Sequence, residues 1–137
     1  MQKDVIKILK KEYPNTKYYL NFSSPIELMV AAILSAQVRD VIVNATTPHI
    51  FKKYKTAKDY AEADLKDLEA LVKSIPFYKN KCKNIKEACK ILAEKHNSTV
   101  PRTMDELTEL PGIGRKTANA ILINAFDIVN GIVVDTH

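Results

Sequence analysis

Two glycines and two basic residues lie close together near the end of the chain, at Gly112, Gly114, Arg115 and Lys116. Glycines two positions apart allow a turn whose backbone approaches a phosphate, because they tolerate positive φ and carry no side chain that blocks the approach. The amides that open a following helix would point at the same anion. These residues therefore favour a phosphate-binding turn, although a lone Gly-x-Gly more often marks an ordinary helix connection with a solvated basic tip.

Lys116 would lie in the first turn of that following helix, two residues after Gly114. Its amine becomes a nucleophile when it loses its proton, and the positive end of the helix dipole disfavours the charged form. Phosphates and a nearby carboxylate oppose this effect. Asp135 is a candidate for that carboxylate and for the proton acceptor. Asp135 followed by Thr136 is also typical of a helix N-cap, and the two roles are compatible.

The composition indicates one basic domain. The chain has 137 residues, enough for a single core, and a formal net charge of +5. The positive charge favours a polyanionic partner without proving one. The sequence contains no secretory signal pattern and no apolar run long enough to span a membrane, so we expect a cytoplasmic protein without a membrane partner.

The two cysteines and three histidines do not form a recognisable metal motif. Cys82 and Cys89 lie seven residues apart in a predicted helix, about 10.5 Å along its axis, which is too far for a disulfide. We therefore predict no metal site and two buried, reduced thiols.

Apolar residues recur at helical spacing along most of the chain, so we predict an all-helical array. Ser24, Pro25 and Glu27 predict the start of a buried central helix. Pro48 removes an amide donor, so we expect a kink or restart in the helix around it. No convincing pair of alternating strands is evident. The first predicted helix is amphipathic and ends before Pro14. Three longer helices are predicted at about residues 25–35, 39–53 and 79–96, and three short ones begin after Thr56, Asp64 and Thr103.

Five segments, in this order, resemble the endonuclease III family of helix-hairpin-helix DNA glycosylases. They are residues 21–28, 34–40, 78–82, 110–118 and 133–137. The resemblance implies a helix-hairpin-helix glycosylase domain over residues 21–137 that forms a six-helix barrel lobe. It also implies that an N-terminal helix in residues 1–20 packs with a second lobe.

The resemblance also implies the chemistry of base excision repair on double-stranded DNA. Lys116 would attack the anomeric carbon of an oxidised pyrimidine nucleotide, and Asp135 would be its acid/base partner. The resulting Schiff base allows β-elimination, which cuts the strand beside the lesion. The backbone-binding hairpin residues would be Gly112, Ile113, Gly114 and Arg115.

Further roles follow from the extrusion of the damaged nucleotide, which these enzymes require. By resemblance, Gln37 fills the vacated space and Phe77 wedges in from the opposite loop, where Pro76 replaces a glycine of the bacterial members and should stiffen the loop. A core position for Phe77 is the alternative. Asp40 and His137 match positions near the lesion pocket, although each is also compatible with an ordinary exposed polar residue.

The match departs from the family after Asp135. Family members continue into a second lobe that often carries a four-iron four-sulfur cluster, and Cys82 and Cys89 do not match its ligands. We therefore expect no cofactor in this chain, and a cluster only where the intact protein continues past His137. A form truncated after Asp135 should be a monomer with weak DNA binding and little turnover.

The alternatives differ in their use of lysine. Adenine-specific and mismatch-specific branches usually lack it at the hairpin position, so Lys116 argues against them. The match over residues 34–37 favours oxidised pyrimidines over oxidised guanine. The alternative from another class is a non-catalytic helix-hairpin-helix module that binds DNA backbones.

Overall fold

The computed structural model describes residues 20–129 and 132–133, and within these ranges helices account for nearly all regular structure. The elements are α2 (Pro25–Leu34), α3 (Asp40–Lys53), α4 (Ala57–Ala61), α5 (Leu65–Leu71), α6 (Tyr78–Lys95), α7 (Met104–Thr108), α8 (Arg115–Phe126), β1 (Ile128–Val129) and β2 (Ile132–Val133). The predicted all-helical class is confirmed. The helix predicted over residues 1–20 lies, apart from Leu20, outside the described residues.

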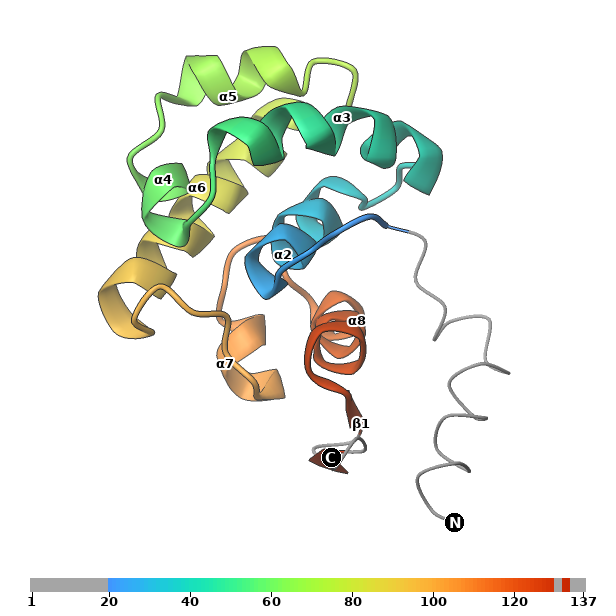
Figure 1. Cartoon of the computed structure of the whole chain (residues 1–137), viewed down its shortest axis with the longest axis vertical. Helices are drawn as coiled ribbons and strands as arrows, with labels where there is room; N and C mark the ends of the chain where they lie inside the picture. Colours follow the sequence, from blue (N-terminus) through green and yellow to red (C-terminus); the bar gives the residue numbers. More distant parts are fainter. Residues whose placement is uncertain (1–19, 130–131, 134–137) are drawn as a thin grey trace.

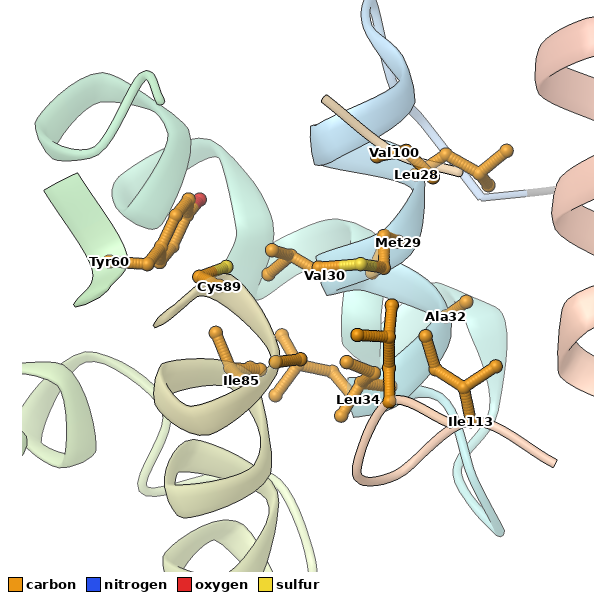
Figure 2. Close-up of a cluster of buried hydrophobic side chains, with 14 of the residues drawn as sticks. Leu28, Met29, Val30, Ala32, Leu34, Tyr60, Ile85, Cys89, Val100 and Ile113 are labelled. Atoms are coloured by element: carbon orange, nitrogen blue, oxygen red, sulfur yellow. The ribbon is translucent and has the colours of Figure 1, made fainter. Parts of the chain in front are cut away.

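Helix α2 lies at the centre of the fold, with α3 and α6 on one side and α8 on the other (Figure 1). Every residue from Leu28 to Leu34 is buried. Figure 2 shows α2 side chains packed with Tyr60 of α4, Ile85 of α6 and Ile113 of the α7–α8 connection. The predicted position of this helix is confirmed, because all of its faces meet other elements.

The start of α2 differs in one detail from the predicted capping box. The Ser24 hydroxyl accepts a hydrogen bond from the Glu27 amide at 3.3 Å, as predicted. The Glu27 carboxylate accepts from Ser23, both from its amide and from its hydroxyl at 2.8 Å. Because Ser23 offers two donors, the carboxylate reaches one residue further back than the predicted motif requires.

Predicted caps also open three short helices. Thr56 and Asp59 form a full capping box at α4. The Asp64 carboxylate accepts from the Lys66 amide at α5, and the Thr103 hydroxyl accepts from the Glu106 amide at α7. Within the described ranges, no helix has the length and apolar character needed to cross a bilayer.

A kink or a restart was predicted at Pro48. Helix α3 continues through Pro48, so the restart is wrong, and the kink stays a prediction. Val43 and Thr46 are buried before the proline, and Thr47 and Ile50 are buried next to it and after it. A single helix buries all four side chains in one core, and this outweighs the one amide hydrogen bond that the proline ring removes.

A short strand pair that was not predicted follows α8. Strands β1 and β2 are antiparallel, with Ile128 opposite Val133 and Val129 opposite Ile132. The sequence signal is present, because Asn130 and Gly131 separate the two apolar pairs and Asn-Gly favours a two-residue hairpin loop.

Candidate functional site

The connection between α7 and α8 contains the predicted glycine turn. Gly112 has φ +83°, a left-handed conformation that favours glycine. A Cβ atom at Gly112 would also lie 3.0 Å from the Cβ of Asn84 on α6. Gly114 is the N-cap of α8 with an extended backbone, and a Cβ there would meet no atom within 4 Å. Gly112 is therefore required by the fold, whereas Gly114 leaves the space in front of α8 open.

Ile113 anchors this turn in the core. Its side chain is 4% exposed, and Figure 2 shows it close to Ala32 and Leu34 of α2. Its amide donates to the Leu110 carbonyl at 3.2 Å. The Ile113 side chain cannot reach DNA, so the predicted DNA contact of this residue is restricted to its main chain.

Arg115 and Lys116 are both exposed on the first turn of α8. The first amides of a helix lack intrahelical acceptors and carry the positive end of the dipole. Two basic side chains and these amides therefore face solvent beside the open space at Gly114. This arrangement can bind a phosphate, and it leaves the Lys116 amine accessible to a bound substrate.

Two other predicted site residues lie in left-handed turns. Gln37 has φ +61° and follows the end of α2 in a turn closed by the Val38 amide and the Ser35 carbonyl at 3.0 Å. Phe77 has φ +59° at the N-cap of α6. Gln37 is exposed and Phe77 is 68% exposed. The alternative core position for Phe77 is therefore wrong. Both turns present a side chain to solvent on a backbone that is strained for a residue other than glycine.

The predicted pocket residues are only partly described. Asp40 is the first residue of α3 and is half-buried, three residues after Gln37. Asp135 and His137 lie outside the described residues, so their predicted roles stay predictions. A surface pocket of about 350 Å³ between the start of α2 and the end of α8 includes Arg102 and Phe126 but none of the predicted site residues. A turn that binds a DNA backbone does not require such a pocket.

Lys81 is a buried charged residue that was not among the predicted site residues. It is 6% exposed on α6, and its Nζ donates to the carbonyls of Leu34 at 3.0 Å and Ala36 at 2.6 Å. Burial lowers the pKa of this amine. The sequence carries a signal for it, because Lys81 shares the apolar face of α6 with Tyr78 and Ile85.

The cysteines do not fit an iron–sulfur cluster. Cys82 and Cys89 are fully buried in the core on α6, and burial raises the pKa of each thiol to about 12. A four-iron cluster needs four thiolates, and the chain has two cysteines. Over the described ranges, no cluster of three metal-ligating side chains occurs. The thiols are core residues, as predicted.

Comparison with known proteins defines the class. A family model described as HhH-GPD superfamily base excision DNA repair protein matches residues 30–137. The chain therefore belongs to the HhH-GPD superfamily. Within it, the predicted resemblance to endonuclease III is confirmed: the chain is 45% identical to endonuclease III of Synechocystis and 40% identical to that of Escherichia coli K12, each over 134 residues. The matches cover 98% of this chain but 61% and 63% of those relatives.

Solved structures agree with this assignment. A trapped endonuclease III–DNA covalent intermediate is 40% identical, with a TM-score of 0.80 over 93% of this chain and 61% of the other. A thermostable thymine-DNA glycosylase has a TM-score of 0.74 at 19% identity, which supports the fold alone. The described helices therefore have the arrangement found in enzymes of base excision repair.

Proposed function

We propose that the chain is a glycosylase and abasic-site lyase that acts on oxidised pyrimidines in double-stranded DNA. One observation carries the proposal: an exposed lysine, Lys116, lies on the first turn of α8 directly after a glycine turn that is open to a phosphate. A backbone-binding turn would bring the sugar of the bound nucleotide to the amine. The related endonuclease III structure is a covalent intermediate with DNA, which supports the same chemistry.

The chemistry follows from the amine. The neutral Lys116 nitrogen forms a bond to C1′ as the bond from C1′ to the base breaks, and the base leaves with its electron pair. The nitrogen loses a proton, and Asp135 is proposed as the acceptor. Protonation of the ring oxygen opens the sugar to a Schiff base. Loss of a C2′ proton then expels the 3′ phosphate, and water releases the enzyme from the imine.

The exposed turns support extrusion of the damaged nucleotide. Gln37 and Phe77 extend into solvent from separate connections, as two groups that enter a duplex must. We also propose that the protein works as a monomer in the cytoplasm without a cofactor bound to the residues of this chain.

Borohydride trapping on abasic-site DNA tests the proposal. Reduction of the Schiff base should give a covalent complex with the unaltered chain, in lower yield than with a full-length relative, because the matches cover only 61% and 63% of the Synechocystis and Escherichia coli relatives. Lys116→Gln should abolish the complex. Lys66→Gln is the matched control, because it removes the same charge from an exposed lysine on α5. Its complex should form as in the unaltered chain.

The same variants decide between the enzyme and a non-catalytic DNA-binding module. The module alternative has one observation in its favour, since an exposed Lys116 is also suited to a phosphate contact. A module would give salt-dependent DNA binding in both forms and no adduct in either. That result would contradict the proposed lyase.

A further inference from the structure

Lys81 connects the two turns that carry Gln37 and Phe77. Its backbone amide donates to the Phe77 carbonyl at 3.1 Å, the first hydrogen bond of α6. Its side-chain nitrogen donates to the carbonyl of Ala36, the residue directly before Gln37, at 2.6 Å. Lys81 therefore forms one hydrogen bond beside Gln37 and one beside Phe77, although these two residues lie far apart in the sequence.

The environment of Lys81 favours this geometry. The second acceptor of Nζ is Leu34, the last residue of α2, at 3.0 Å. The last carbonyls of a helix lack intrahelical donors and form the negative end of its dipole, so a buried ammonium is stabilised there. Burial disfavours the charge, and carbonyl partners within 3.0 Å offset that cost.

The same stretch of α6 also contacts the glycine turn. Phe77, Lys81 and Asn84 are spaced four and three residues apart, which places them along one side of the helix. Asn84 is the neighbour that a Cβ atom on Gly112 would meet at 3.0 Å. The first two turns of α6 therefore lie against the Phe77 turn, the Gln37 turn and the glycine turn.

We propose that Lys81 is a positioning residue that fixes the Gln37 turn against the Phe77 turn, so that both side chains enter the duplex at one nucleotide. This inference rests on the proposed glycosylase function. Lys81 touches neither DNA nor the reacting atoms in this role. Its side chain acts through the Ala36 carbonyl, and its backbone amide bonds the Phe77 carbonyl at the start of the same helix.

The first test compares Lys81→Met, Lys81→Arg and the control Lys90→Met. Methionine has a similar length but no donor, arginine restores charge and donors, and Lys90 is an exposed residue further along α6. Each protein is measured for DNA affinity, for single-turnover strand cleavage and for extrusion. The extrusion signal is the fluorescence of 2-aminopurine placed beside the lesion.

We expect Lys81→Met to keep its DNA affinity within about threefold but to lose the extrusion signal and at least about tenfold in cleavage rate, because small misplacements are costly in oriented reactions. Lys81→Arg should recover both, and Lys90→Met should match the unaltered chain. Unchanged extrusion in Lys81→Met would overturn the inference, as would equal losses of affinity and rate. An unaltered chain that gives no trapped adduct would instead overturn the proposed function.

A second measurement needs no variant and no DNA. The Val38 amide closes the Gln37 turn, and the Lys81 amide closes the Phe77 turn. If Lys81 couples the two turns, hydrogen exchange should give the same opening free energy for both amides. Opening constants that agree within about threefold support the inference. Independent opening of the two turns would overturn it, even if Lys81→Met failed to fold.

Discussion

At the scale of single residues, the two glycines of the turn have different tasks. Gly112 needs its left-handed φ and its missing side chain, because Asn84 occupies the adjacent space. Gly114 has a backbone that other residues adopt and faces open space. The structure therefore separates a glycine required for folding from one that we expect to matter for a bound phosphate.

Alanine substitutions should show this separation. Gly112→Ala should lower the free energy of unfolding by about 1–3 kcal/mol, because alanine is strained at this φ and displaces Asn84. Gly114→Ala should cost less than about 1 kcal/mol. It should weaken DNA binding by about tenfold, because a methyl group blocks the phosphate. Denaturant unfolding and fluorescence anisotropy measure the two effects, and a stable Gly112→Ala variant would contradict this view of the turn.

At the scale of elements, the connections that precede α3 and α6 each hold an exposed residue in a strained, left-handed backbone conformation. Gln37 and Phe77 adopt left-handed backbones without glycine. Asn97 and Ser98 do so as well, in the connection between α6 and α7. Strain at a residue with no role in binding can be removed without loss of function, so the two connections can be compared directly.

Phe77→Gly and Ser98→Gly should each raise the free energy of unfolding by up to about 1 kcal/mol, because glycine relieves the left-handed strain and little buried surface is lost. Strand cleavage at a lesion should fall at least about tenfold in Phe77→Gly alone, because the wedge is missing. Thermal unfolding and cleavage assays on both variants measure this. Equal cleavage by the two would remove Phe77 from the site.

Most elements follow from local sequence signals. The caps at Thr56, Asp64 and Thr103 lie where the sequence predicts them. The predicted restart at Pro48 fails because burial on both sides of the proline is a property of the tertiary core, which local rules do not include. The β1–β2 pair was not predicted because its strands are only two residues long, which is too short to show an alternating apolar pattern.

At the scale of the whole molecule, α2 and α6 form a core in which two thiols and a phenol are buried. Cys82, Cys89 and Tyr60 have no exposed side-chain surface. Burial disfavours their charged forms, which raises the pKa of both thiols to about 12 and raises that of Tyr60 further. The stabilisation that these groups provide is therefore complete below the unfolded thiol pKa of about 9 and is lost as the pH rises towards 12.

The melting temperature should fall steeply between about pH 9 and pH 11, because unfolding releases the thiol protons. The double variant Cys82→Ala/Cys89→Ala should melt at a lower temperature but show a shallower fall over this range. The difference between the two slopes of melting temperature against pH reports the thiols alone, because Tyr60 and Lys81 are present in both proteins. Parallel curves for the two proteins would contradict their buried, protonated state.

The site as a whole was predicted less completely than its parts. Residue types and spacing indicated Lys116 and the glycines, because these residues lie in a local motif, whereas Gln37 and Phe77 were indicated by the family resemblance. The contact between Lys81 and Ala36 joins segments that are distant in sequence, and spacing along one helix does not reveal such a partner. Lys81 appears in the sequence only as a charge on an apolar face.

The most direct test of the central claim is to locate the covalent bond. The chain is incubated with abasic-site duplex and borohydride, digested with protease and nuclease, and the modified peptide is sequenced by mass spectrometry. A reduced sugar adduct on Lys116 is the predicted result. An adduct on another lysine or on the amino terminus, with Lys116 unmodified, would contradict the account.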